Sequence, residues 1–277
     1  MIVDYHMHLR GPANGHEGAI ELSVEAVERY VEQAASREVD EIAFTEHMYY
    51  FRQAEPLLAH PYHRSRVAHD LDDYCDAVLE AKSRGLPVKL ALELDWLPES
   101  HERLAEILSP YPWDFLLGSV HLIDGVAVDM ESDSGLWDRV PVESVWRRYF
   151  EELGALARSG LADVLAHPDL VKIFGRRPAP DVVEACHEAA SAAISESGVA
   201  VEVSTAGFRK PVGELYPDAG FLARCSERGV GATLASDAHV AHDVGRDFAA
   251  GLELLRSAGY ETLTVFAGRE ARQEPLG

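Results

Sequence analysis

Histidines and acidic residues recur in this sequence at spacings that suit metal binding. His6 and His8 form a His-x-His pair inside a short apolar stretch. In an extended strand this spacing puts both rings on one face, because side chains alternate. Imidazoles combined with carboxylates are a ligand set that zinc, manganese and iron accept. Further residues of these types lie at or just after the ends of other short apolar runs: Glu46, His47, Glu93, His121, His167, Asp237 and His239.

The elements that must position these residues alternate along the chain. Longer intervals with helical periodicity separate the apolar runs. Repeated strand–helix alternation predicts an α/β fold, a distorted (β/α)7 TIM-like barrel that forms a single domain over residues 1–277. The segment at about residues 261–267 fits a short strand or a helix equally well. Apolar, β-branched runs predict strands at about residues 2–6, 41–45, 88–93, 115–121, 162–167, 199–204 and 230–235.

A parallel barrel would bring the candidate ligands together, because the carboxyl ends of its strands converge on one mouth. Six of the seven predicted strands deliver an imidazole or a carboxylate to that mouth. The alternative, a set of ordinary packed histidines, would desolvate the rings without giving them partners. The segment from Met48 to His69 is long for a connection, and we expect it to form a lid or a substrate wall.

The composition limits the classes of partner. The chain has 47 acidic residues against 25 lysines and arginines, a formal net charge of −22. Such a chain repels nucleic acids and anionic membrane surfaces, so we expect neither as a partner. We also expect neither a signal peptide nor a membrane-spanning segment. The three cysteines form no Cys-x-x-Cys pair, which favours reduced thiols and a cytoplasmic location.

Seven motifs occur in a fixed order between about residues 2 and 245: Asp-Tyr-His-Met-His, Phe-Thr-Glu-His, Leu-Glu-Leu, Gly-Ser-Val-His, Ala-His-Pro-Asp-Leu, Val-Glu-Val-Ser-Thr-Ala-Gly and Ser-Asp-Ala-His. Together they resemble the polymerase and histidinol phosphatase (PHP) family, and most closely its monofunctional histidinol-phosphatase branch. The resemblance implies a site for three divalent metal ions, zinc, manganese or iron, or a mixture of them. It carries no implication about the oligomeric state.

The resemblance also implies which residues would hold each ion. The groups would be His6, His8, Glu93 and Asp237 for the first ion, Glu93 as a bridge with His121 and His167 for the second, and His47, His239 and His16 for the third. The loop that carries His16 departs from the family spacing. Ser204 departs as well, since the family pattern has asparagine there.

The reaction implied by the resemblance is hydrolysis of a small phosphorylated substrate, L-histidinol phosphate, to L-histidinol and phosphate in histidine biosynthesis. A hydroxide that bridges two ions would attack the phosphorus atom, with Glu93, Asp237 and His239 as the catalytic residues. Substrate contacts are expected from the loops that follow the strands, and the candidates are Arg209, Lys172 and Arg52.

Three other functions stay open. A PHP-family phosphoesterase could act on a nucleotide or a sugar phosphate instead. An amidohydrolase shares the barrel and the His-x-His pair, but it usually needs a lysine at a strand end, and Lys89 lies near the start of its predicted strand. A non-catalytic metal-binding domain would be expected to have lost ligands, whereas the expected ligand positions are filled here.

Overall fold

Seven parallel strands form the centre of the protein. The computed structural model describes residues 1–12, 19–130 and 135–277. Neighbouring strands pair in the order β1-β2-β3-β4-β7-β8-β9, with every pairing parallel. Their bounds are β1 (Val3–Asp4), β2 (Glu41–Phe44), β3 (Val88–Asp95), β4 (Phe115–Ser119), β7 (Val164–Leu165), β8 (Ala200–Ser204) and β9 (Ala232–Ala235).

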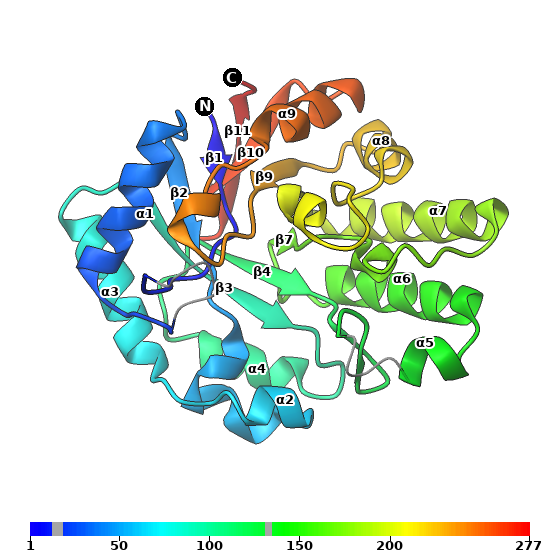
Figure 1. Cartoon of the computed structure of the whole chain (residues 1–277), viewed down its shortest axis with the longest axis horizontal. Helices are drawn as coiled ribbons and strands as arrows, with labels where there is room; N and C mark the ends of the chain where they lie inside the picture. The colour runs from blue at the N-terminus through cyan, green and yellow to red at the C-terminus, as the bar shows by residue number, and fades with distance from the viewer. Residues whose placement is uncertain (13–18, 131–134) are drawn as a thin grey trace.

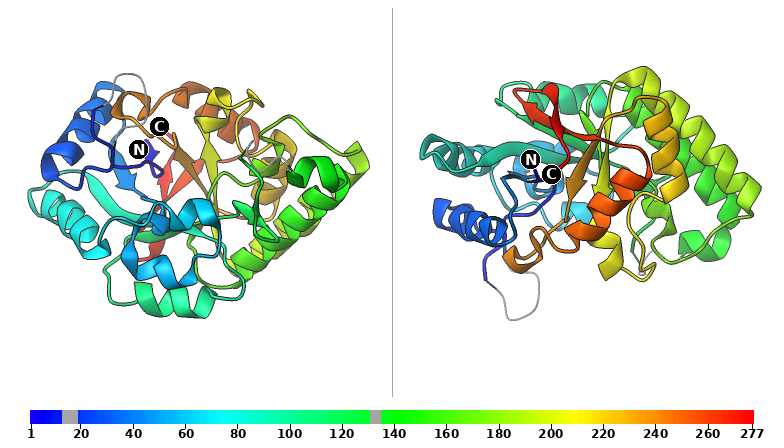
Figure 2. Two further views of the ribbon diagram at one scale, coloured as in Figure 1. Left: turned by 60° about the horizontal axis from the view of Figure 1, so that its bottom comes forward. Right: turned by 90° about the horizontal axis from the view of Figure 1, so that it is seen from above.

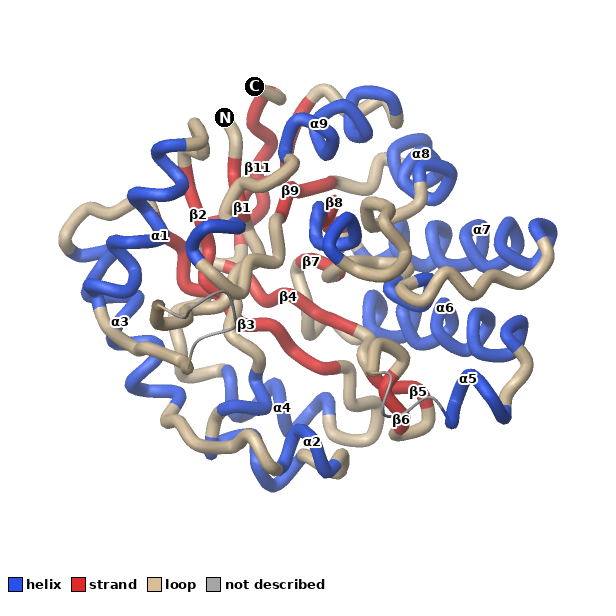
Figure 3. Tube along the Cα trace, viewed as in Figure 1, coloured by secondary structure: helices blue, strands red, loops and turns tan. Residues whose placement is uncertain are grey.

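The first and last strands of this sheet meet, so the sheet curls into a barrel. The amide of Tyr5 donates to the carbonyl of Leu234 at 3.1 Å, and Met7 forms a parallel bridge with Ala238. The strands lie inside and the helices surround them (Figure 3). The predicted seven-stranded α/β barrel is therefore confirmed, and each of the seven barrel strands overlaps a predicted strand.

Helices connect the strands and cover the barrel (Figure 1). Local signals explain several of their ends: Ser23 accepts a hydrogen bond from the amide of Ala26 at the start of the first helix, and Gly198 ends another at a φ of 75°. The longer helices are α1 (Val24–Ser36), α3 (Leu71–Ser83), α4 (His101–Leu108), α6 (Val142–Arg158), α7 (Pro180–Ser197), α8 (Ala219–Glu227) and α9 (Phe248–Ser257). None of the helices in the described part of the chain is both long and apolar enough to cross a bilayer.

The long segment after β2 folds into short helical turns. These are the 3-10 turns η1 (Met48–Tyr50) and η2 (Arg52–Leu57), followed by α2 (Pro61–Arg64). Phe51 is buried against Tyr74 of α3, with ring centroids 5.4 Å apart. This packing attaches the segment to the barrel, so the segment is an ordered part of the fold.

Two small hairpins add to the barrel. After β4 come β5 (Leu122–Ile123) and β6 (Val126–Ala127), and α5 (Gly135–Arg139) follows. The undecided segment proves to be a strand: β10 (Thr262–Ala267) pairs antiparallel with β11 (Glu270–Pro275). Phe266 of β10 packs on Phe115 at 5.3 Å between ring centroids. The two chain ends lie close together (Figure 2), and the Met1 ammonium donates to the carbonyl of Pro275.

Candidate metal centre

Glu93, near the end of β3, lies at the centre of a histidine cluster. Its carboxylate is 1% exposed. Oε1 lies 3.4 Å from His121 Nε2 and 3.2 Å from His167 Nε2. Oε2 lies 3.4 Å from His6 Nε2, 3.8 Å from His8 Nε2 and 2.6 Å from His47 Nδ1. One carboxylate therefore faces five imidazoles, which come from the strands or strand ends of β1, β2, β4 and β7.

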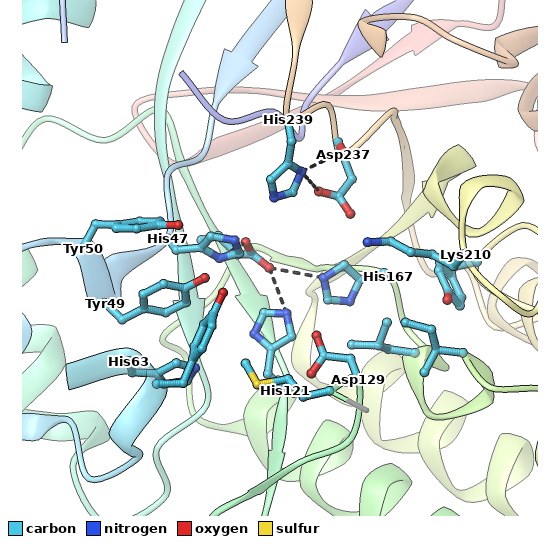
Figure 4. Close-up of a pocket in the computed structure, with 16 residues that line it drawn as sticks. His47, Tyr49, Tyr50, His63, His121, Asp129, His167, Lys210, Asp237 and His239 are labelled. Atoms are coloured by element: carbon cyan, nitrogen blue, oxygen red, sulfur yellow. Dashed lines mark hydrogen bonds and ion pairs between the residues drawn. The ribbon is translucent and has the colours of Figure 1, made fainter. Parts of the chain in front are cut away.

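The turn after β9 completes the cluster. Asp237 Oδ1 lies 3.4 Å from His8 Nε2, 3.6 Å from His6 Nε2 and 3.5 Å from His239 Nδ1. The His8 ring has the rings of His47 and His239 at 4.2 and 4.1 Å between centroids. Figure 4 shows His47, His121, His167, Asp237 and His239 turned toward the same space. Within each of three sets of residues, one donor atom from every member lies within 4.8 Å of the others. The sets are His6, Glu93 and His167; His6, His8 and Asp237; and His8, His47 and His239.

These donors fit divalent metal ions. The Nε2 atoms of His6 and His8 and Oε2 of Glu93 are buried and make no hydrogen bond within the part of the chain that the structure describes. Buried polar atoms without partners are destabilising and rare in folded proteins. An ion between them would satisfy these atoms at once, and a mixture of imidazole and carboxylate suits zinc, manganese and iron.

Carboxylates behind the cluster orient three of its rings. His6 Nδ1 lies 2.9 Å from Glu202 Oε2, His121 Nδ1 lies 2.8 Å from Asp95 Oδ1, and His8 Nδ1 lies 3.5 Å from Glu46 Oε2. A carboxylate on the far nitrogen fixes the ring and directs the other nitrogen to a metal. Sequence reasoning missed Asp95. The available signal was its position two residues after Glu93, which places both on one face of β3.

The charges in the cluster depend on one another in the ion-free protein. Burial alone would raise the pKa of Glu93, but the surrounding histidines, first His47 and then His6, hold it well below its ordinary value. Burial alone would lower the pKa of His121, yet its hydrogen bond with Asp95 and the charge of Glu93 raise it to about 10. Protons on His6, His8 and His121, whose pKa values are raised, thus provide positive charge that metal ions would otherwise bring.

Two cluster residues have unusual backbone conformations. His167 has a φ of 26° and Asp237 a φ of 50°, both in the region that non-glycine residues rarely adopt. The amide of His167 donates to Glu202 Oε1 at 3.1 Å, so the same carboxylate that orients His6 also holds this backbone. Strained residues of this kind persist where the surrounding structure fixes them, and they cluster at functional sites.

The structure brings together eight of the nine predicted metal ligands, and His16 lies outside the described residues. The predicted substrate residues are placed differently. The side chain of Arg52 is 62% exposed and donates to the carbonyl of Ala68, outside the pocket at the cluster. Lys172 is buried, and its ammonium donates to the carbonyl of Leu215 at 2.7 Å and lies 3.1 Å from Asp169. Neither side chain is placed to contact a ligand at the cluster.

Arg209 was expected to contact the substrate, but its neighbour Lys210 is the basic residue that lines the pocket. Arg209 donates to the backbone carbonyl of Ser236 and lies 3.6 Å from Asp243, so it holds the turn that carries Asp237. Lys210, which sequence reasoning did not select, lines the pocket beside Asp237 and His239. Only the position of Lys210 next to Arg209, after strand β8, could have pointed to it.

The cluster forms the floor of a pocket of about 180 Å³. The segment after β2 supplies one wall, as predicted, through Tyr49, Tyr50, Tyr62 and His63. The Tyr49 ring stacks between His47 and His63, with centroids 4.6 and 4.4 Å away. The remaining described lining residues include Asp129, Met130, Leu170, Ile173, Lys210 and Tyr216. The pocket therefore combines a metal-binding floor, an aromatic wall and charged groups of both signs.

Two of the curated proteins that resemble this chain are histidinol-phosphatases. A probable histidinol-phosphatase of Deinococcus radiodurans is 31% identical over 271 residues, which cover 97% of each chain. The histidinol-phosphatase of Bacillus subtilis is 24% identical over 259 residues, 83% of this chain and 93% of that protein.

The fold is similar to that of a solved histidinol phosphate phosphatase from Lactococcus lactis, crystallised with zinc, L-histidinol and phosphate. The two structures superpose with a TM-score of 0.75 at 20% identity and cover 98% of both chains. A PHP domain is recognised over residues 16–206, more than half of the sequence. By these similarities in sequence, and in agreement with the cluster of donors at the barrel mouth, the chain belongs to the PHP family.

Proposed function

We propose that this protein hydrolyses L-histidinol phosphate to L-histidinol and phosphate. The observation that carries the proposal is the cluster around Glu93, where eight candidate metal ligands meet and six of them line one pocket. The relatives named as histidinol-phosphatases, and the bound zinc, L-histidinol and phosphate of the similar structure, support this substrate.

We also propose that three divalent ions, drawn from zinc, manganese and iron, occupy the cluster. His6, His8 and Asp237 would hold one ion, with Glu93 bridging to another at His121 and His167. The third would lie at His47 and His239, with His16 as a further ligand. Bound there, the ions would activate a water molecule and offset the charge of the phosphate group.

The residues of the chain would bind and orient the substrate. Of the described residues that line the pocket, Lys210 brings the ammonium that suits a phosphate oxygen. The depressed pKa of Glu93 and of Asp237, in each case lowered by neighbouring histidines against the effect of burial, keeps both groups ionised as ligands. The aromatic wall would exclude water and contact the imidazole ring of the substrate. The net charge of −22 acts from a distance and is screened by salt.

A substrate panel tests the proposal. The metal-loaded protein is assayed with L-histidinol phosphate, a nucleoside monophosphate, a sugar phosphate and 4-nitrophenyl phosphate. We expect kcat/KM for L-histidinol phosphate to exceed the others by at least about a hundredfold, a difference of about 2.7 kcal/mol in transition-state binding. Comparable turnover of all four would contradict the assignment, and a preferred nucleotide or sugar phosphate would replace it.

Two variants separate the basic residues. Lys210→Met should lower kcat/KM, because it removes a charge-assisted contact with the phosphate group. Arg52→Ala is the matched control, since its side chain is exposed and lies outside the pocket. Equal activity of both variants would show that Lys210 does not bind the substrate.

A further inference from the structure

We propose that Asp129 binds the ammonium group of the substrate and so selects an amino-alkyl phosphate over one without a positive charge. This inference rests on the proposed function and adds a specificity-determining residue to it. Two observations support it: Asp129 lies on the loop that begins at the candidate metal ligand His121, and its Oδ1 atom is buried without a hydrogen-bond partner in the described parts of the chain.

The loop after β4 places Asp129 at the pocket. This loop begins at His121, makes the hairpin of β5 and β6, and folds back, since the amide of Val128 donates to the carbonyl of His121 at 2.9 Å. The indole of Trp137 holds it from the other side by donating to the carbonyl of Val128 at 3.1 Å. Asp129 follows directly and lines the pocket with His121 and His167. Figure 4 shows its carboxylate on the His121 side of the pocket, opposite His239.

The carboxylate of Asp129 differs from the other acidic groups of the pocket. Glu93 and Asp237 each lie within 4 Å of several histidines, so they already have positive partners. Asp129 forms no ion pair within 4 Å in the described parts of the chain, and its buried Oδ1 has no hydrogen-bond partner there. A buried anionic oxygen without a partner is destabilising, and a cationic ligand would relieve that.

The substrate carries a matching group. In L-histidinol phosphate the amino group is separated from the ester oxygen by two carbon atoms, so an ion-bound phosphate leaves the ammonium close to the pocket floor. Taking that ammonium out of water without a counter-charge is unfavourable, whereas a charge-assisted hydrogen bond to a carboxylate compensates for it. With Lys210 on the phosphate and Asp129 on the amine, the pocket matches both charges of the substrate.

The test compares two phosphate esters that differ only in the amino group. One is L-histidinol phosphate, and the other is its deamino analogue, 3-(imidazol-4-yl)propyl phosphate. We expect the wild-type protein to prefer the first, and Asp129→Asn to reduce kcat/KM for the first by about ten- to a hundredfold. The same variant should leave the deamino analogue within about twofold of wild type, with metal content unchanged. The matched control is Asp124→Asn, because Asp124 lies in the same hairpin but is exposed and paired with Arg148.

The outcomes separate this inference from the proposed function. Equal losses on both substrates would overturn the inference, because they indicate a role in metal binding or in protonating the leaving group. The wild-type protein provides a measurement that needs no variant: turnover of L-histidinol phosphate without preference over the deamino analogue overturns the role of Asp129 alone. If the wild type hydrolyses neither compound, the proposed function fails and the inference fails with it.

Discussion

Glu93 has more contacts with the cluster than any other carboxylate described here, since both of its oxygens face imidazoles. Oε1 faces His121 and His167, and Oε2 faces the histidines at the ends of β1 and β2. A carboxylate in this position can hold two cations at a short separation, because each oxygen binds one of them. The negative charge of Glu93 would therefore offset the repulsion between two cations bound next to each other.

We expect Glu93→Gln to remove most bound metal and to lower kcat/KM by at least about a hundredfold, the upper end of the losses seen when even an outer partner of a metal ligand is replaced. The amide is nearly the same size, so the fold should survive. Metal analysis and turnover measure the effect, and circular dichroism checks the fold. Retained activity at full metal content would contradict the bridging role of Glu93.

Metal binding should release protons. In the ion-free protein the pKa of His121 is raised to about 10, since Asp95 and Glu93 outweigh burial. The pKa of His6 is also raised, because Glu202 and Asp237 outweigh burial. Both rings are therefore protonated near neutral pH, and a metal ligand must be deprotonated. Affinity should rise with pH up to about 10, and calorimetry in two buffers of different ionisation enthalpy should detect the protons. A buffer-independent enthalpy would contradict this assignment.

Among the elements, the 3-10 turn η5 (Thr205–Arg209) positions Lys210, which lines the pocket. It connects β8 to Lys210, and it passes so close to the following loop that only a glycine fits. A Cβ atom on Gly207 would lie 1.8 Å from the carbonyl oxygen of Glu214. The position of Lys210 thus depends on a backbone contact between two loops.

Gly207→Ala should displace η5, because the contact is with backbone atoms that cannot rotate away. We expect a loss of about 1–3 kcal/mol in the free energy of unfolding, the usual range for overpacking, and a lower kcat/KM as Lys210 moves. Urea denaturation and steady-state kinetics measure the two effects. Wild-type values for both would show that the loops separate easily.

Helix packing predicts a second effect at this scale. His187 of α7 is 3% exposed, stacks on Phe221 of α8 at 5.0 Å and contacts Phe150 of α6. Burial lowers its pKa from 6.5 to about 4. Between these values the unfolded chain binds a proton that the folded chain does not, so stability falls as the pH falls.

His187→Phe should remove this dependence. Between pH 7 and pH 5 the wild-type protein should lose about 2 kcal/mol of unfolding free energy more than the variant. Denaturant titrations at both pH values give the comparison. Parallel losses in the two proteins would show that His187 is not responsible.

At the scale of the whole molecule, the barrel joins candidate metal ligands from distant parts of the chain. His6 and His8 belong to the first strand segment, whereas Asp237 and His239 follow the last strand of the barrel. We expect removal of metal by a chelator to abolish turnover and to lower Tm by several degrees, because ions bound only to the folded state stabilise it. Readdition of zinc or manganese should restore both, and an unchanged Tm would contradict a cross-barrel site.

The sequence predicts those features of the fold that depend on local patterns. Short apolar runs located the strands, and parallel topology then implied that Glu93, His121 and His167 would lie at one mouth of the barrel. That Glu93 would be shared by the other two was implied by the resemblance to the PHP family. The directions of loop side chains were not readable. Lys172 is drawn to the carbonyl of Leu215 and Arg209 to that of Ser236, partners 43 and 27 residues away.

The C-terminal hairpin shows the same limit. From its sequence, the segment at residues 261–267 fits a strand or a helix, and only pairing with β11 and packing of Phe266 on Phe115 decide for β10. The contact between Asp95 and His121 could not be predicted for the same reason, because the partner of a carboxylate is known only once both side chains are placed in space. Periodicity predicts elements, whereas tertiary contacts select side-chain roles.

The seam where Tyr5 meets Leu234 has a consequence for biosynthesis of the protein. During translation the earliest candidate ligands, His6 and His8, leave the ribosome long before Asp237 and His239 are made. A nascent chain that stops before β9 lacks the last wall of the barrel and the donors that join His8, so it cannot assemble the complete centre. The complete centre that we propose would therefore form late, only in a chain that has been synthesised through His239 and whose barrel has closed.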